Sequence, residues 1–195
     1  MKTARLEAFS DGVIAILITI MVLELRTPPG HDWAALWSLE HRFFPYMLSF
    51  VMLGIYWNNH HHMLHMTDRV TGAILWANLH LLFWLSLVPF GTAWVGETAL
   101  APVPTATYSV VLMLAGTAYW ILKTTIIRAQ GPRSRLQAAL GSDTKGILSV
   151  LLYMVAFALA FMYPPLSAAI WVGVALMWLV PDRRIERHVH QQNGA

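Results

Sequence analysis

Charged residues are scarce and cysteine is absent in this chain of 195 residues. Asp, Glu, Lys and Arg together make up only 12% of the sequence, whereas soluble domains carry about 25%. The absence of cysteine excludes disulfide bonds and thiolate chemistry, and it leaves the redox compartment open. Hydrophobic residues reach 57%. In a chain of this length, such a composition indicates several membrane-spanning helices.

Signatures of catalysis are also missing. The sequence has no Gly-rich phosphate loop, no nucleophile elbow and no His-Glu-x-x-His zinc motif. Its apolar segments contain no paired carboxylates. The net charge of +3 is small, and its basic residues are scattered over short loops. We therefore expect no enzyme activity, no bound metal, no cofactor and no nucleic-acid partner.

The first apolar segment begins with an unusual polar stretch. Residues 12–23 carry no ionisable side chain, and with its shoulders the segment reaches about 20 residues, enough to cross a bilayer as a helix. Phe9-Ser10-Asp11-Gly12 forms its entrance. A carboxylate at this position is costly to desolvate, so Asp11 requires polar partners or water.

One side of this segment combines branched apolar residues with a hydroxyl. Ile16, Ile20 and Leu23 follow one another at intervals of four and three residues, which places them on one side of a helix with Thr19 beside them. Such a face can pack against lipid or another helix, or it can line a passage.

The pattern Arg5-x-x-x-Phe9-Ser10-Asp11-Gly12-x-x-Ala15-Ile16-x-x-Thr19 resembles the first-helix signature of the lysosomal potassium channel family and its bacterial relatives. A looser likeness continues through Tyr56-Trp57-Asn58-Asn59-His60-His61 and Leu87-Val88-Pro89-Phe90. By motif, the resemblance covers about the first half of the chain. Lysosomal members contain two six-helix repeats. This chain has room for one, so it looks like a bacterial, single-repeat member.

The distribution of apolar segments predicts an all-α membrane protein with six transmembrane helices in one domain, residues 1–195. A short surface helix from Trp33 to Arg42, capped by Asp32, should separate the first two spans. We expect Pro45 in the first turn of the second span and a kink at Pro89 in the third. The expected spans are residues 4–26, 45–62, 72–94, 105–127, 146–162 and 166–180.

Basic residues predict the orientation of these spans. Of the 13 Lys and Arg residues, eleven fall on the side of the termini, and only Arg26 and Arg42 fall on the other. Because Lys and Arg concentrate in cytoplasmic loops, both termini should be cytoplasmic. Together with the resemblance, this predicts a multi-pass protein of the bacterial inner membrane.

The resemblance implies a potassium-permeable cation channel, selective or weakly selective. It also implies a homotetramer in the lipid bilayer whose first helices line a central pore. On the matching positions, Ile16 forms the narrowest hydrophobic ring, and Ile20 and Leu23 lie above it. Thr19 supplies a hydroxyl layer that helps distinguish potassium from sodium. A narrow apolar ring of this kind can gate by dewetting. The chain has no Thr-Val-Gly-Tyr-Gly loop, which excludes a carbonyl filter of that type.

The resemblance also implies that Arg5, Phe9, Ser10 and Asp11 form a network that supports the pore helix and binds no ligand. An ordinary interfacial charge pair with a cap-like serine is the other interpretation. At the other end of the segment, Glu24 could form a ring that concentrates cations, or it could pair with Arg26.

Further polar residues leave alternatives open. His60, His61, His62 and His65 can mark a helix end, contact Ser10 or Asp11, or hold a metal. Within the third span, Asn78 and His80 favour an interhelical hydrogen bond over a proton relay.

A cation or proton-coupled secondary transporter is the alternative function. It predicts discontinuous helices, a repeat and a charge at the midplane. The sequence has no clear inverted repeat.

Overall fold

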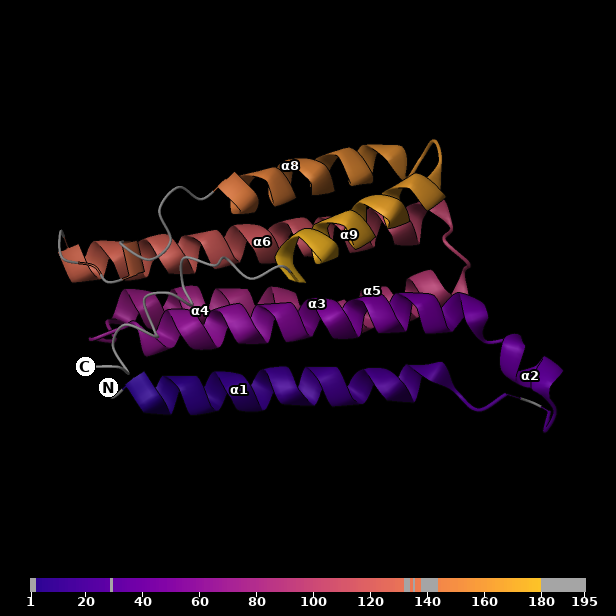
Figure 1. The fold of residues 1–195 in the computed structure, drawn as a ribbon, viewed down its shortest axis with the longest axis horizontal. Coiled ribbons are helices and arrows are strands. Elements are labelled where there is room, and N and C mark those ends of the chain that lie inside the picture. The colour runs from indigo at the N-terminus through magenta and orange to yellow at the C-terminus, as the bar shows by residue number, and fades with distance from the viewer. Residues whose placement is uncertain (1–2, 29, 132–133, 135, 138–143, 180–195) are drawn as a thin grey trace.

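In the computed structural model, long helices lie side by side along the long axis of the molecule (Figure 1). The structure describes residues 3–28, 30–131, 134, 136–137 and 144–179, and these ranges contain no strand, so the expected all-helical fold is confirmed. The elements are α1 (Thr3–Ile20), η1 (Met21–Leu25), α2 (Trp33–Trp37), α3 (Glu40–His65), α4 (Gly72–Ser86), α5 (Val88–Glu97), α6 (Pro102–Gln130), α8 (Thr144–Leu159) and α9 (Pro164–Leu179).

Each expected apolar segment falls largely within one of these helices or within two consecutive ones. By length and composition, three stretches of the described chain are able to cross a membrane: Thr3–Leu25, Gly72–Glu97 and Pro102–Gln130. The apolar helices α8 and α9 have 16 residues each. α3 is long enough, with 26 residues. The asparagines and histidines near its end make it less hydrophobic than the three stretches named above. The molecule is thus a bundle of apolar helices.

The expected surface helix from Trp33 to Arg42 is wrong in its extent. Asp32 does cap α2, because its Oδ1 accepts the amide of Ala35 at 2.8 Å. However, α2 ends at Trp37, and α3 already begins at Glu40. Pro45 therefore lies inside α3 and not in its first turn. Its missing N–H affects only the carbonyl four residues earlier, close to the start of α3, where water can replace the bond.

The third expected span is interrupted beside Pro89. α4 ends at Ser86, α5 begins at Val88, and Pro89 lies in the first turn of α5. Proline has no amide to donate, and its ring collides with the carbonyl four residues earlier, so a continuous helix breaks before it. The kink that the sequence predicts at this position is present.

Small polar side chains join the helices inside the apolar bundle. The hydroxyl of Ser49 on α3 lies 2.6 Å from both Thr92 Oγ1 on α5 and Tyr108 Oη on α6. On α9, the indole of Trp171 donates to Ser109 Oγ on α6 at 3.0 Å. All of these residues are buried. Hydrogen bonds between helices fix the helix register in apolar surroundings, where water cannot replace a lost partner.

We predict that Ser49→Val lowers the stability of the purified protein by about 1–3 kcal/mol, because two buried hydroxyls then lose their shared partner. Ser86→Ala is the matched control, since the exposed Ser86 hydroxyl bonds only within its own helix, to the Phe83 carbonyl. Thermal unfolding in detergent measures the difference. Equal unfolding temperatures for the two variants would contradict the role given to Ser49.

Candidate functional site

α1 lies at one edge of the bundle (Figure 1), and only one of its faces belongs to the apolar core. The core face packs against α3 and α4. It consists of Leu6, Ser10, Ile14 and Leu17, and Met21 of η1 continues it. Large apolar residues on the opposite side of α1 and η1 are exposed, from 39% at Ile20 to 74% at Leu23. Nothing in the described part of the chain covers this outer face.

All four predicted pore residues lie on the outer face. Ile16 is 60% exposed, and Thr19, Ile20 and Leu23 are exposed as well, whereas the neighbouring Leu17 is buried. The Thr19 hydroxyl donates to carbonyls of its own helix, at 3.0 Å to Ala15 or 2.9 Å to Ile16. Its oxygen therefore keeps lone pairs that can face a cation or water.

A 3₁₀ turn changes the register at the end of this face. Met21–Leu25 is a 3₁₀ helix that continues α1 directly. In a 3₁₀ helix, residues three apart eclipse each other. Leu23 therefore lies almost directly above Ile20, instead of drifting around the axis as it does in an α-helix. The sequence gives no signal for this change, because Ile20-Met21-Val22-Leu23 reads as one apolar run.

Ser10 begins a buried chain of hydrogen bonds across three helices. Its Oγ donates to the Leu6 carbonyl at 2.9 Å and accepts from Asn78 Nδ2 on α4 at 2.9 Å. The Oδ1 of Asn78 lies 2.7 Å from His60 Nε2 on α3. Because Oδ1 can only accept, His60 carries its proton on Nε2. All three side chains are fully buried. Asn78 thus forms the interhelical bond that the sequence favours.

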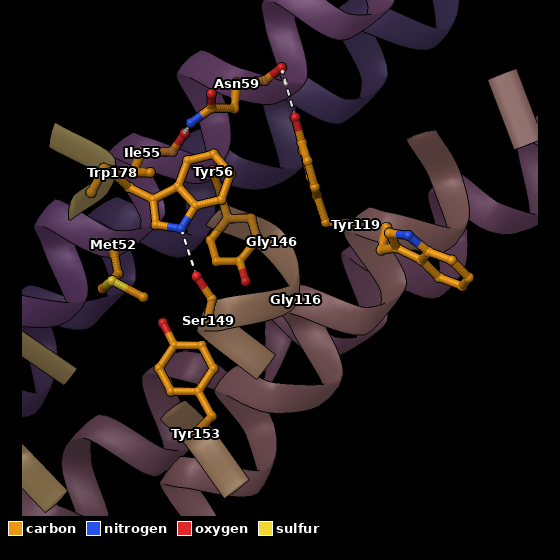
Figure 2. Close-up of a pocket in the computed structure, with 11 residues that line it drawn as sticks. Met52, Ile55, Tyr56, Asn59, Gly116, Tyr119, Gly146, Ser149, Tyr153 and Trp178 are labelled. Atoms are coloured by element: carbon orange, nitrogen blue, oxygen red, sulfur yellow. Dashed lines mark hydrogen bonds between the residues drawn. The ribbon is translucent and has the colours of Figure 1, made fainter. Parts of the chain in front are cut away.

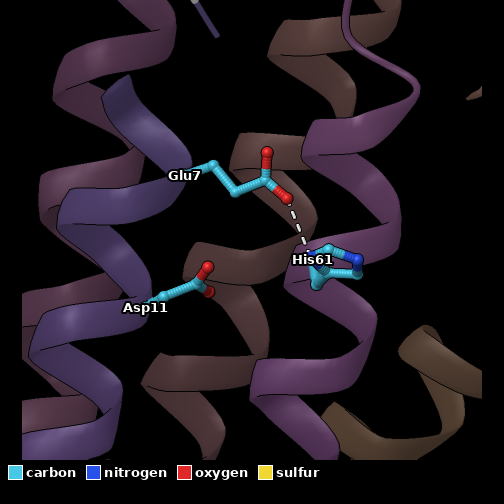
Figure 3. A group of neighbouring side chains, drawn as sticks. All are labelled: Glu7, Asp11 and His61. Atoms are coloured by element: carbon cyan, nitrogen blue, oxygen red, sulfur yellow. Dashed lines mark ion pairs between the residues drawn. The ribbon is translucent and has the colours of Figure 1, made fainter. Parts of the chain in front are cut away.

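Two further contacts join α1 to α3 next to this chain. The Trp57 indole donates to Asp11 Oδ1 at 3.0 Å, and His61 Nδ1 lies 2.8 Å from Glu7 Oε1 (Figure 3). Glu7 and Asp11 are one turn apart on α1, as Trp57 and His61 are on α3, so the contacts form successive rungs. Sequence reasoning missed Glu7 and Trp57. Glu7 and Asp11 are four residues apart, and so are Trp57 and His61. These equal intervals were the signal in the sequence that could have indicated the two pairs.

Ligand atoms of Glu7, Asp11 and His61 lie within 4.8 Å of one another, close enough to surround a metal ion. The direct Glu7–His61 contact and the bond from Trp57 to Asp11 already account for the arrangement of these side chains. The geometry therefore supports polar contacts that join α1 to α3.

The structure assembles only part of the predicted support network within one subunit. Ser10 and Asp11 have the partners described above. Arg5 and Phe9 are exposed on the outer side of α1, and neither contacts Ser10 or Asp11 through a hydrogen bond or ion pair among the described residues.

The remaining polar candidates are His80, Arg26 and Glu24. His80 is exposed and accepts from the Trp84 indole one turn later on α4, at 2.9 Å, and it has no hydrogen bond to another helix among the described residues. Arg26 lies 3.2 Å from Glu97 Oε1, so its ion pair is not with Glu24. Glu24 itself is exposed at the end of η1.

The comparisons with known proteins identify the family. The model of the endosomal/lysosomal potassium channel TMEM175 matches residues 5–89. A potassium channel of Chryseobacterium sp. (strain P1-3) is 49% identical over 191 residues, covering 98% of this chain and 100% of that protein. The chain belongs to the TMEM175 potassium channel family. A potassium channel of Streptomyces collinus is 35% identical, over 86% of this chain and 87% of its own length.

The fold agrees with TMEM175 membership. The crystal structure of a lysosomal potassium-selective channel TMEM175 homolog from Chamaesiphon minutus superposes with a TM-score of 0.80 at 30% identity. The match covers 91% of this chain and 96% of that one. All candidate residues, from Arg5 to Asn78, lie in the stretch matched by the TMEM175 model. Homologues named as potassium channels belong to a non-enzymatic class of protein.

We predict that Asp11→Asn and Trp57→Phe are energetically coupled. Each single change removes the same hydrogen bond or weakens it, so the double variant should lose less stability than the sum of the two singles. A coupling of about 1.5–3 kcal/mol is expected for a hydrogen bond to a charged group. Unfolding of the purified protein in mixed micelles measures it. His80→Gln, on the exposed side of α4, replaces Trp57→Phe in the control cycle, and coupling of equal size there would contradict a specific contact.

Proposed function

We propose that this chain forms a potassium-permeable cation channel of the bacterial inner membrane, in which α1 and η1 line the pore. The observation that carries the proposal is the uncovered apolar face of α1, with its single hydroxyl layer at Thr19, in a member of the TMEM175 family. Relatives at 49% and 35% identity are named potassium channels. The solved homologue is described as potassium-selective.

The exposed face of α1 supports assembly into a ring. An apolar stripe that one subunit leaves open is covered when copies of the chain meet around an axis, and closed rings are the usual symmetric solution. We propose four copies, which places four α1 helices around the pore. The exposed Arg5 and Phe9 then lie where subunits meet, and they complete the support network begun by Ser10 and Asp11.

Ile16 is the proposed constriction and hydrophobic gate. Four isoleucines facing one axis leave a narrow apolar neck that holds water poorly, so ions cross it only when the neck widens or wets. Thr19, one turn later, offers hydroxyl oxygens that replace part of the hydration shell of potassium. Ile20 and Leu23 continue the lining, and the 3₁₀ turn aligns them with each other.

Six spans with both termini in the cytoplasm form the proposed topology, with residues 1–195 as a single channel domain. The start of α1, the α3–α4 connection and the end of α6 lie at one end of the bundle, while α2 and the α8–α9 turn lie at the other (Figure 1). Arg5, Arg69 and Arg128 belong to the first group, and Arg26 and Arg42 to the second. This distribution supports the positive-inside orientation.

The break between α4 and α5 favours the second candidate, a cation or proton-coupled transporter. Discontinuous helices are common at transporter binding sites. Within the described residues, however, the break contains no charged side chain, and a proline explains it locally. Unitary currents distinguish the two functions, because a transporter turns over too slowly to produce them.

We predict potassium-carrying single-channel currents from the purified protein in planar bilayers. Absence of such currents, with only slow coupled flux in liposomes, would favour the transporter. Ile16→Asn should raise the unitary conductance and lower the potassium-to-sodium permeability ratio, because a polar neck wets more easily. Thr19→Val should lower the ratio with little gain in conductance, since it removes the hydroxyl without widening the pore.

Ile18→Asn is the control for these recordings, since Ile18 lies on a half-buried side of α1. Its conductance and permeability ratio should match those of the unmodified channel. Equal effects at positions 16 and 18, or no effect at 16, would show that another face lines the pore.

The topology predicts opposite locations for two reporters. An enzyme reporter at the C-terminus should be active in the cytoplasm, and one inserted at Gly30, between η1 and α2, should be active in the periplasm. A matched insertion at Asp68, in the α3–α4 connection, should behave like the C-terminal fusion. Finding the Gly30 and C-terminal reporters on the same side would overturn the proposed orientation and the even number of spans.

A further inference from the structure

A small cavity of about 40 Å³ lies between α3, α6, α8 and α9. Five of the eleven residues in its wall are aromatic, and two are glycines, which add no side chain to it (Figure 2). α1 contributes no residue to it. The cavity is therefore separate from the outer face of α1, and what it binds does not depend on which helix lines the pore.

Two tyrosine hydroxyls lack a partner in this cavity. Tyr153 is only 1% exposed, yet its hydroxyl makes no hydrogen bond to any described residue, and the same holds for Tyr56. Both hydroxyls point toward the part of the cavity beside Ser149 (Figure 2). Ser149 itself is occupied, because it accepts from the Trp178 indole at 2.9 Å and donates to the Lys145 carbonyl at 2.8 Å. Both tyrosines line the cavity, so a polar group bound there can supply hydrogen bonds that the described residues do not.

A second hollow of about 190 Å³ adjoins the first between α6 and α8. The two hollows share Trp120 and Gly146 in their walls. Apart from the hydroxyl of Thr117 and the indole N–H of Trp120, the described side chains around the outer hollow are apolar. α8 lies at the edge of the bundle opposite α1 (Figure 1). The outer hollow therefore faces away from the candidate pore surface.

The size and chemistry of the two hollows define the class of ligand. A dry cavity of about 150 Å³ accommodates benzene, and about 10–15 Å³ suffices for one water molecule. The outer hollow thus has room for an aromatic ring or a short alkyl chain, and the inner one for a hydroxyl group with one or two waters. Among the described residues, no charged side chain lines either hollow, which disfavours an ionised ligand because burying an unpaired charge is costly.

We propose that the two hollows form one binding site for a small neutral amphiphile with an apolar ring and a single hydroxyl group, such as a phenol dissolved in the membrane. The ring occupies the space between α6 and α8, beside Trp120. The hydroxyl reaches past Gly146 and exchanges hydrogen bonds with Tyr56 and Tyr153. Because residues of four helices surround the site, occupancy holds α8 and α9 against α3 and α6.

The probe for this site is 4-(trifluoromethyl)phenol, observed by fluorine NMR with the full-length protein in lipid nanodiscs. Trifluoromethylbenzene is the matched probe without a hydroxyl, and empty nanodiscs report partitioning into lipid. We expect the phenol to bind saturably and to be displaced by excess 4-ethylphenol. Trifluoromethylbenzene should bind at least several-fold more weakly.

Tyr153→Phe tests the hydroxyl contact and should weaken phenol binding about 2- to 10-fold, the effect of one neutral hydrogen bond. Tyr163→Phe is the matched control on the exposed α8–α9 turn, and it should leave binding unchanged. Gly146→Leu places a side chain where the hollows meet and should abolish displaceable binding, and an unfolding curve like that of the unmodified protein establishes that it folds.

The proposal fails if the phenol shows only the partitioning seen in empty nanodiscs, which would mean that water or lipid chains alone fill the hollows. It also fails if the two probes bind equally well, or if Tyr153→Phe binds as tightly as Tyr163→Phe. Conduction is not measured in these experiments, so their outcome is independent of the pore assignment.

Discussion

The hydrogen-bond chain from Ser10 through Asn78 to His60 holds α1 in its orientation. It joins α1, α4 and α3 with three fully buried side chains, in surroundings where water cannot replace a lost partner. The apolar core face of α1 could slide or rotate against its neighbours at little cost, because apolar contacts are not directional. A fixed donor and acceptor at Ser10 removes this freedom. Because the rotation of α1 is fixed in this way, Ile16 and Thr19 lie on its exposed side.

The contacts of Glu7 and Asp11 continue this constraint toward the end of the bundle. They lie at the boundary of the apolar layer, where carboxylates can keep some water while their other oxygens are bound by α3. Polar contacts to other helices thus concentrate at the first turns of α1, and the later turns present apolar residues on both sides apart from Thr19. On the proposed pore assignment, this division separates the part of the helix that sets its position from the part that lines the pore.

Much of the fold could be predicted from the sequence, because apolar runs of membrane length are bounded by prolines, glycines and charges. The break in the third span could also be predicted, because a proline at position 89 cannot continue a regular helix. The boundary between α2 and α3 could not be predicted, since Ser38 and Leu39 are compatible with either a helix or a turn. Pairings such as Trp57 with Asp11, or Arg26 with Glu97, depend on how the helices lie in space. For the site, the interval of Ile16, Ile20 and Leu23 predicted their common face, but the 3₁₀ turn beyond Ile20 has no counterpart in composition.

The length of the segment that follows α1 depends on whether it is wound as a 3₁₀ helix or as an α-helix. A 3₁₀ helix rises about 2.0 Å per residue and an α-helix about 1.5 Å, so rewinding the five residues Met21–Leu25 as α-helix would shorten the segment by about 2.5 Å. The same change would turn Leu23 by about 60° relative to Ile20, from an eclipsed position to one farther around the axis. The side chains that lie on the exposed face beyond Thr19 are therefore set by local winding as well as by sequence, and a change of winding there leaves the buried anchor at Ser10 untouched.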